Sequence, residues 1–549
     1  MSKLSNAVSE MKTVNDLRLE ETVTNFMGGD SYKINPLDTL KMISASSIFG
    51  EPAFYREGRK GGRYGVSSYV DKWSVIPDEY EGLNTEQIME RAIDAALEYD
   101  FMATLEWAME LRNTYNMRLN PQVIMVRAAT HPNRSKFTEE HPGVFNKINT
   151  AVMGRPDEPM TQMSYYLYKN KGKKNNVPSI LKRSWKARIS DFSAYNVAKY
   201  KNHEIGLINA VRICHANNKH IDTLMQTGNF VMENENKKTW ENLRSEGKSW
   251  KEIFETVDMG HMALLRNLRG VFTEVEDLEF CKVYLEKLKS GVKYGQQFPF
   301  RYYSALKAVK GEVKVHHKPT IIDALEECID LACDNMPRLH GKTMCLSDNS
   351  GSAWGTFNSE YGSVTVADID NLSSVITAAC SDEGYVGKFG DKLIVYPISK
   401  RQGILHQTTD IGKMGMSDVG GSTEGGIWEF FKKAIDNKEH WDNIFIYSDQ
   451  QAGHAGLYGT ESHKREYSKL GYGTSSYGGY INVFKLVQEY RKKVNPKVNV
   501  FSIQTAGYDN VVIPEMAYRT NIMYGWTGKE SMFADAMIKV WDDIEERNN

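Results

Sequence analysis

The sequence predicts an α-helical repeat segment followed by an α/β domain with a mostly parallel, doubly wound sheet. The first observation is the length of 549 residues, which is enough for two or more sizeable hydrophobic cores. The second is a succession of amphipathic helical patterns between about residues 80 and 340. The third is a change at about residue 341 to short apolar runs that alternate with helical patterns. We therefore expect a helical domain over 1–340 and an α/β domain over 341–549.

The helical half shows apolar residues at helical spacing together with helix-start signals. Asp100 precedes one such segment, and Asn120-Pro121 opens the next, because proline is favoured in the first turn of a helix. Helices are expected over 85–100, 101–116, 120–130, 205–216, 262–272, 278–290, 299–310 and 319–335. Since no strict sequence repeat is present, the pattern favours an α-solenoid of degenerate, HEAT-like repeats.

The second half contains short apolar runs that are bounded by turn residues. These runs predict strands over 342–348, 392–397, 442–449 and 497–504. Helical patterns over 372–380, 425–435 and 481–493 lie between the strands. This alternation is typical of a mostly parallel sheet with helices on both faces, in which ligands bind at the carboxyl ends of the strands.

Composition and charge narrow the class of protein. Hydrophobic residues make up 41% and charged residues 25% of the chain, as in ordinary globular proteins. No run of about 18 apolar residues indicates a membrane span, and the first residues lack the apolar core of a signal peptide. The six cysteines show no regular spacing, so we expect them to be reduced and the protein to be cytoplasmic. The net charge of −2 excludes the class of nucleic-acid-binding proteins that are basic over their whole length.

Polar side chains follow the first predicted strand of the α/β half at alternate positions. Two other segments should lie at the same edge of the sheet as these side chains. One is a glycine-rich loop with two hydroxyl residues, and the other is the end of a later strand, which carries an aspartate. The candidate ligands are Asp348, Ser350, Ser352, Ser422, Thr423 and Asp449. Hydroxyl and carboxylate oxygens without thiolate or imidazole suit Mg²⁺, with Mn²⁺ as the second choice. Serine-rich capping turns are also common after strands, which is the alternative for the first loop alone.

This half resembles a von Willebrand factor A domain with its metal-ion-dependent adhesion site. That site takes an Asp-x-Ser-x-Ser motif from the first loop, a threonine from the second and an aspartate from the third. The resemblance implies that Asp348, Ser350, Ser352 and Asp449 are ligands. In the second loop Ser422 stands where threonine is usual, with a threonine beside it, so either hydroxyl could face the metal.

A local excess of positive charge lies in the helical half. Between Lys169 and Lys201 the chain has ten Lys or Arg residues and one acidic residue, Asp191. We regard several cations of this segment as RNA-binding candidates, among them Lys182, Arg183, Lys186 and Arg188. Because cations that neutralise phosphates release counterions, this excess favours RNA binding over a merely solvated face. The interleaved aromatic residues could stack on bases, but we favour their being core residues.

The whole chain resembles the Ro 60 kDa-type proteins, which carry the TROVE domain shared by telomerase-associated, Ro and vault proteins. The resemblance rests on the order of "SSIFGEPAFYREG", "SWKARISDFSAYNVAKYKN", "MALLRNLRG", "FPFRYYSALKAV", "DNSGSAWG" and "VGGSTEGGIW", and it runs from about residue 38 to the C-terminus. It implies a monomeric ring of helical repeats held shut by the A domain. It also implies small stem-loop Y RNA on the outer surface and single-stranded ends of misfolded RNA in the cavity.

The same resemblance implies RNA quality control or a scaffold for RNA decay, without enzymatic activity and with an exoribonuclease as a candidate partner. The family's Y RNA contacts correspond to Lys199, Lys201, His203, Arg212 and His215, although His203 stands where the family often has arginine. A second basic stretch has glycine and arginine mixed, as in a phosphate-contacting loop that faces the cavity or in an ordinary surface loop. Its cations are Arg56, Arg59, Lys60 and Arg63.

Two other functions compete with RNA binding. The first is a metal-dependent, adhesion-type scaffold in which an acidic residue of a protein partner completes the metal coordination and RNA has no part. The second is a hydrolase that uses the metal to activate water. The hydrolase is disfavoured because no further carboxylate cluster or candidate base stands near Asp348 or Asp449.

Overall fold

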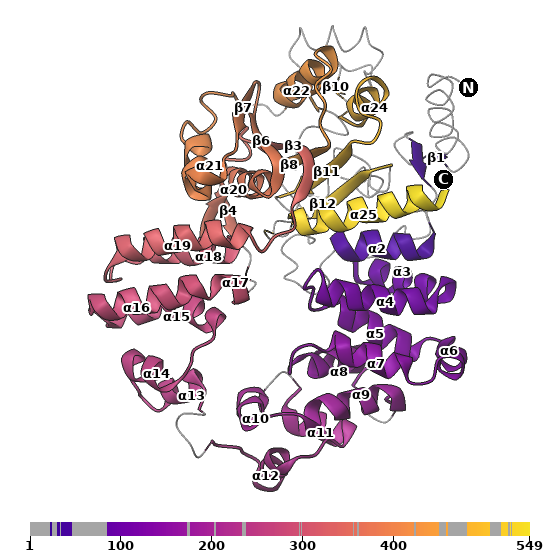
Figure 1. Cartoon of the computed structure of the whole chain (residues 1–549), viewed down its shortest axis with the longest axis vertical. Coiled ribbons are helices and arrows are strands. Elements are labelled where there is room, and N and C mark those ends of the chain that lie inside the picture. The colour runs from indigo at the N-terminus through magenta and orange to yellow at the C-terminus, as the bar shows by residue number, and fades with distance from the viewer. Residues whose placement is uncertain are drawn as a thin grey trace.

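The structure is a computed structural model, shown in Figure 1, in which the helical and α/β parts follow each other around a circuit. It describes residues 22–24, 30–32, 35–46, 85–172, 176–202, 205–232, 238–295, 297, 299–354, 356–359, 362–421, 424–448, 457–458, 480–481, 483–505, 518–524, 528 and 530–548. The sequence predictions at Arg56, Arg59, Lys60, Arg63 and His203 fall outside these residues, as do those at Ser422, Thr423 and Asp449.

The helical part begins after β1 (Thr22–Thr24) and β2 (Asp30–Tyr32). Its first helices are α2 (Pro36–Ser46), α3 (Thr85–Tyr99), α4 (Phe101–Asn113), α5 (Asn120–Thr130), α6 (Arg134–Glu140), α7 (Val144–Val152), α8 (Glu158–Lys169), α9 (Ser179–Ser190), α10 (Ala194–Tyr200) and α11 (Leu207–Cys214). They continue as α12 (Lys219–Thr227), α13 (Trp240–Ser245), α14 (Trp250–Thr256), α15 (His261–Glu274), α16 (Leu278–Ser290), α17 (Val292–Gly295), α18 (Pro299–Gly311) and α19 (Lys318–Cys333).

The predicted helix starts have clear local causes. The Asp100 carboxylate accepts a hydrogen bond from the Ala103 backbone N–H at 2.9 Å and caps α4 as expected. Pro121 lies in the first turn of α5, where its missing N–H costs nothing. The Asn120 side chain serves a different purpose: it donates to the Ser44 carbonyl at 2.8 Å and joins α5 to α2.

The described residues of the α/β part form a six-stranded sheet in the order β12-β11-β8-β3-β6-β7. Its strands are β3 (Leu339–Asp348), β6 (Ser381–Phe389), β7 (Leu393–Pro397), β8 (Asn443–Ser448), β11 (Asn499–Gln504) and β12 (Thr520–Tyr524). All neighbours are parallel except β6 and β7. The mostly parallel, doubly wound sheet predicted from the sequence is therefore confirmed, although β6 and β12 were not among the predicted strands. Short pairs β4 (Thr356–Ser359) with β5 (Gly362–Thr365) and β9 (Leu457–Tyr458) with β10 (Tyr480–Ile481) lie outside this sheet.

Helices cover both faces of the sheet, and alternate strand residues point to opposite sides. Helices α20 (Val366–Ala379) and α25 (Glu530–Asn548) lie on one face, where Cys345 of β3 joins the core that continues into the helical repeats. Helices α22 (Glu424–Asp436) and α24 (Val483–Lys493) cover the other face, where Met344 and Leu346 of the same strand are buried. A strand buried on both faces reads as a continuous apolar run, which is why β3 was predictable.

The circuit is closed by contacts between the two parts at both ends of the helical repeats (Figure 1). The first helix of the repeats, α2, packs on the last helix of the chain, α25, and the Arg547 guanidinium donates to Asp38 at 2.7 Å. At the other end α19 packs on α21 (Ile404–Gly412), and the Ile404 backbone N–H donates to Asp330 at 2.8 Å. The α/β part therefore spans the two ends of the solenoid.

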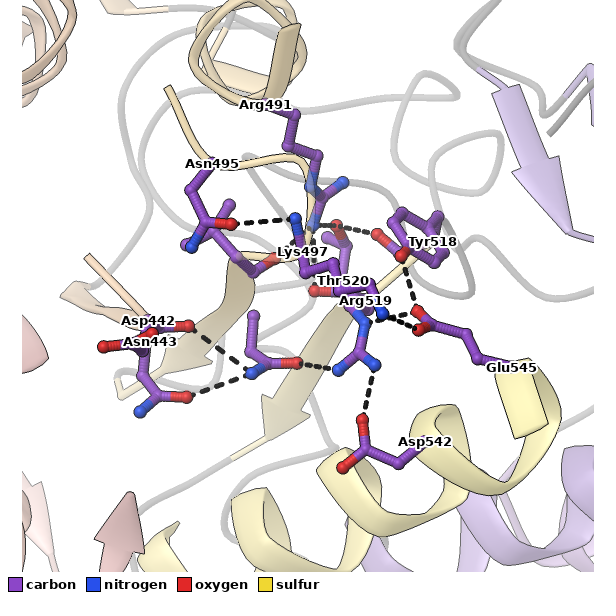
Figure 2. Close-up of polar contacts among 12 residues, drawn as sticks. Asp442, Asn443, Arg491, Asn495, Lys497, Tyr518, Arg519, Thr520, Asp542 and Glu545 are labelled. Carbon is purple, nitrogen blue, oxygen red and sulfur yellow. Dashed lines mark hydrogen bonds and ion pairs between the residues drawn. The ribbon is translucent and has the colours of Figure 1, made fainter. Parts of the chain in front are cut away.

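A buried arginine network fastens α25 to the amino end of the sheet, as Figure 2 shows. Arg519, at the start of β12, donates to Glu545 at 2.8 Å, to Asn499 at 3.0 Å and to Asp542. Arg491, at the end of α24, donates to the Arg519 carbonyl at 2.9 Å. Residues from β11, β12, α24 and α25 thus share one set of charge-assisted hydrogen bonds.

The described part of the chain contains no helix that is long and apolar enough to cross a membrane. All six cysteines lie within it; each is buried and has a free thiol.

Candidate metal and RNA-binding sites

Asp348 is the last residue of β3, at the point where the order of the sheet reverses direction. Its strand is flanked by β6 and β8, so the loops that follow β3 and β8 leave the sheet side by side. The Asp348 side chain is fully buried; one oxygen accepts from the Ser350 backbone N–H at 2.9 Å and the other from the Ser448 hydroxyl at 2.6 Å. These two donors fix the direction of the carboxylate.

The two motif serines lie together in the turn that follows Asp348. The hydroxyl oxygens of Ser350 and Ser352 are 3.3 Å apart. Ser350 is fully buried, whereas Ser352 is exposed, so the pair reaches from the sheet edge to the surface. An amide network holds the turn, because Asn349 donates to Asn371 of α20 at 2.9 Å and accepts from it at 3.0 Å.

The glycine-rich second loop approaches the first loop closely. The Gly351 backbone N–H donates to the Gly421 carbonyl at 2.9 Å. The loop is anchored by a salt bridge of 2.7 Å between Asp418 and Lys388, whose side chain is fully buried on β6. The described backbone therefore places Gly421, which directly precedes Ser422, against the first loop. Ser422, Thr423 and Asp449 themselves lie outside the described residues.

The described ligands fit a small divalent cation. Adjacent oxygens around an octahedral Mg²⁺ with metal–oxygen distances of 2.0–2.1 Å are about 3 Å apart. The separation of 3.3 Å between the Ser350 and Ser352 hydroxyls is close to that value. Within the described ranges no group of three or more His, Cys, Asp or Glu side chains forms another candidate metal site. The arrangement agrees with a hydroxyl-rich site that has a single carboxylate in its first loop.

Sequence reasoning missed Ser448 and Asn371, which support the first loop. Ser448 ends β8 and directly precedes Asp449, so it was interpreted only as part of the strand. The parallel pairing of Ser347 with Tyr447 puts Ser448 beside Asp348. Asn371 lies in the first half of a buried helix, where a polar residue that is only 1% exposed signals a buried hydrogen-bond network.

The predicted RNA-binding cations lie on α9, α10 and α11, which we call the α9–α11 basic surface. Its members are Lys182, Arg183, Lys186, Arg188, Lys199 and Arg212. Arg183, Lys186, Lys199 and Arg212 are exposed, while Lys182 and Arg188 are half-buried. None of the six side chains forms a salt bridge with a carboxylate of the described residues. Lys199 lies over the rings of Tyr195 and Tyr200, each with a nitrogen-to-centroid distance of 5.5 Å.

Two further predicted contacts, Lys201 and His215, directly follow α10 and α11, and Lys201 has structural partners of its own. The Lys201 ammonium donates to the Asn229 side chain at 2.8 Å and to the Phe230 carbonyl at 3.1 Å, and so ties α10 to the segment after α12. His215 is exposed and follows α11 with a left-handed φ of 57°. Lys201 therefore has a role in packing whether or not it contacts RNA.

Most aromatic residues of the basic segment belong to the core, as favoured from the sequence. Tyr165, Tyr166, Trp185 and Phe192 are each less than a tenth exposed. The Trp185 ring nitrogen donates to Gln162 at 2.8 Å, deep between α8 and α9. Exposed aromatic rings in this segment are those of Tyr168 and Tyr195. Base stacking on this surface would therefore depend on these two rings.

Comparisons with known proteins support the fold. No family model matches the chain, and no curated protein matches it. Its structure is similar to the crystal structure of the Ro (RSR) protein of Deinococcus radiodurans, with a TM-score of 0.58 and 12% sequence identity. The alignment covers 82% of this chain and 93% of that chain. The chain therefore has the Ro-type fold expected from its motifs, with helical repeats followed by a von Willebrand factor A-like sheet.

Proposed function

We propose that this chain, which has the Ro-type fold, is an RNA-binding ring protein. In this proposal a small noncoding, Y-like stem-loop RNA binds the outer surface, and single-stranded ends of misfolded RNA enter the ring. Residues 1–340 form the RNA-binding domain and residues 341–549 the A-like domain. The observation that carries the proposal is the α9–α11 basic surface, whose cations have no carboxylate partners among the described residues.

The charge argument favours a polyanionic ligand. A surface cation that is paired with a carboxylate has its charge locally compensated, so it adds little to the positive potential that attracts a polyanion. An unpaired cation gains from phosphate because the condensed counterions of the nucleic acid are released. The α9–α11 basic surface belongs to a chain with a net charge of −2, so the excess is local and not a property of the whole molecule.

The test is a binding titration with a labelled stem-loop RNA at several salt concentrations. The variant carries Lys186→Glu, Lys199→Glu and Arg212→Glu, all at exposed positions. We expect at least about tenfold weaker binding and a slope of log K against log salt that flattens by about 2 to 3, one unit for each lost phosphate contact. The matched control carries Lys136→Glu, Lys282→Glu and Lys432→Glu, which are surface positions on α6, α16 and α22. Equal loss in both variants would contradict a specific surface.

The biological role that follows is RNA quality control, or a cytoplasmic scaffold for RNA decay, without enzymatic activity. An exoribonuclease is the partner such a scaffold would require. A divalent cation, Mg²⁺ before Mn²⁺, would be held by Asp348, Ser350 and Ser352 together with groups of the second and third loops. When bound, the cation would supply a positive charge that joins these loops.

A second candidate function is metal-dependent binding of a protein. It is favoured by the surroundings of the first loop, where Ser352 is exposed and Met416 lies against Gly351. Met414 and Met416 are 56% and 48% exposed, and flexible methionines are common at protein-binding surfaces. Purification of the native protein separates the two functions: copurified RNA supports the ring proposal, whereas a protein partner that is released by a chelator, with no RNA present, supports the scaffold.

A further inference from the structure

A second group of unpaired cations lies on and next to α15, α17 and α18, which are separate from the helices of the α9–α11 basic surface. We call it the α15–α18 basic surface; its members are Arg266, Arg269, Lys293, Arg301, Lys307 and Lys310, together with Lys314 in the turn after α18. All seven side chains are exposed. Between Lys293 and Lys318 the chain has one acidic residue, Glu312. In Figure 1 α15 and α18 lie on the left side of the circuit, whereas α9 and α11 lie at its lower right and α10 near the bottom.

The geometry brings helix α15, with its cations, beside helix α18. His261, the first residue of α15, makes a hydrogen bond of 2.6 Å to Tyr302 near the start of α18. At the other end the His316 backbone N–H, just after α18, donates to the Phe272 carbonyl at 2.7 Å. The two helices therefore run parallel and in contact along their length.

On α15 the apolar residues Leu264, Leu265 and Leu268 are buried, while Arg266 and Arg269 share the exposed stripe, one helical turn apart. On α18 Arg301 is exposed beside Tyr302, the residue that bonds to α15. The three arginines thus lie on adjacent helices at solvent-facing positions.

The neighbouring helix α16 provides a comparison, because its lysines are paired with carboxylates. Its lysines form salt bridges with carboxylates: Lys282 with Glu279 at 2.7 Å, Lys287 with Asp258 at 2.6 Å, and Lys289 with Glu327 at 3.0 Å. None of the cations of the α15–α18 basic surface forms a salt bridge with a described carboxylate. The local positive charge is therefore uncompensated on α15 and α18 but compensated on α16.

An exposed aromatic ring lies on α17, a short helix that packs on α15. Tyr294, next to Lys293 on α17, is 84% exposed, which is unusual for a large aromatic side chain. Lys307 lies over the Tyr303 ring, with its nitrogen 5.4 Å from the centroid. Unpaired cations beside an exposed ring are the combination that binds single-stranded nucleic acid, because phosphates pair with the cations while bases stack on the ring. An acidic protein or a duplex would use the cations but not the ring.

We propose that the α15–α18 basic surface is a second RNA-binding site, which takes single-stranded RNA through phosphate contacts from Arg266, Arg269 and Arg301 and stacking on Tyr294. This inference rests on the proposed function and specifies a second surface for it. A structured RNA held at the α9–α11 basic surface could then place an unpaired segment on the α15–α18 basic surface. Sequence preference at the second site is weak, because no base-specific donor is required.

The first experiment measures binding of a labelled oligouridine of about 20 nucleotides, longer than the site size of most single-strand-binding folds. The test variant carries Arg266→Ala, Arg269→Ala and Arg301→Ala. The control removes the same charge elsewhere with Lys136→Ala, Lys432→Ala and Lys539→Ala, at surface positions on α6, α22 and α25. We expect the test variant alone to bind at least about tenfold more weakly, with a salt slope that flattens by about 2, since each single-strand phosphate contact contributes about 0.7.

The second experiment replaces the ring. Tyr294→Ala should weaken oligouridine binding by at least about fivefold, whereas Tyr99→Ala, at a 57% exposed position on α3, should leave it unchanged. Polyglutamate serves as a polyanion without bases. If it competes as well as oligouridine and Tyr294→Ala has no effect, the surface binds polyanions in general and the RNA assignment is overturned.

The outcomes separate this inference from the function on which it rests. Loss of stem-loop binding in the α9–α11 variant, with oligouridine binding unchanged in the Arg266, Arg269 and Arg301 variant, would refute the second site and retain the proposed function. Absence of binding to both RNAs by the unaltered protein would refute both.

Discussion

At the scale of single residues, Asp348 is the side chain on which the candidate metal site depends. Its two oxygens are already held by a backbone N–H and by the Ser448 hydroxyl, so the carboxylate is oriented before any cation binds. A carboxylate that is fully buried is costly to leave without a charged partner, and a bound cation would supply that partner. Its supporting groups therefore also contribute to the affinity for a cation, although less than the carboxylate itself.

We predict that Asp348→Ala abolishes Mg²⁺ and Mn²⁺ binding, because it removes the only carboxylate of the first loop. Isothermal titration calorimetry of the full chain measures the effect directly. Ser448→Ala, which leaves the carboxylate in place but removes one of its donors, should weaken binding by about tenfold. Asp410→Ala, at a 57% exposed carboxylate on α21, is the control and should bind the metal normally. Unchanged affinity in Asp348→Ala would show that the metal site is wrong.

At the scale of elements, much of the fold was predictable because its signals are local. Asp100 marks the start of α4, and the apolar run of β3 is buried on both faces. Strand β6 was missed because "SDEGYVGKF" contains charges and glycines. Gly384 is required there by a close approach, since an added Cβ would lie 1.9 Å from the Ala378 carbonyl oxygen. The spacing of Asp348, Ser350 and Ser352 indicated the first loop, but the Ser448 contact depends on strand register, which no local pattern contains.

The Arg519 network could not be predicted from local sequence patterns either, because its members come from four different helices and strands. We predict that Arg519→Ala destabilises the fold by about 3–5 kcal/mol, since it leaves Glu545 without its main partner in a largely buried position. Lys539→Ala, which removes an exposed ion pair with Asp535 on the same helix, should cost no more than about 1 kcal/mol. Chemical denaturation of both variants gives the comparison, and similar small effects would show that the network does not fasten α25.

The same network predicts a dependence of stability on pH. Burial opposes ionisation of Glu545, but hydrogen bonds from Arg519, Lys497 and Tyr518 outweigh it and lower the pKa of this carboxyl to about 2. A carboxyl whose pKa is lower in the folded state stabilises the fold above its unfolded pKa, and this contribution is lost as the pH falls toward the folded pKa. We therefore expect about 2–3 kcal/mol of unfolding free energy to disappear between about pH 5 and pH 2. Glu545→Gln should lack that part of the decrease when both proteins are titrated.

At the scale of the whole molecule, the circuit is closed by residues that are far apart in the sequence. The contact between Asp38 and Arg547 joins the first described helix of the repeats to the last helix of the chain. The Asp38 side chain is 2% exposed, so its charge needs this partner more than a surface charge would. The Arg519 network holds the same helix α25 to the sheet, and the two sets of contacts therefore act in series to keep the circuit closed.

Combined with the proposed RNA-binding function, a closed circuit predicts which kind of RNA binds best. A free single-stranded end can enter a ring, whereas a circular RNA cannot enter unless the ring opens. We predict that a hairpin with an unpaired 3′ tail competes better than the same hairpin with its tail paired, and better than a circularised version. Arg547→Glu places a second negative charge beside Asp38 and should open the closure. In that variant the disadvantage of the circular RNA should shrink, because entry no longer requires an end. Equal competition by all three RNAs in the unaltered protein would exclude end entry and leave binding on the outer surface alone.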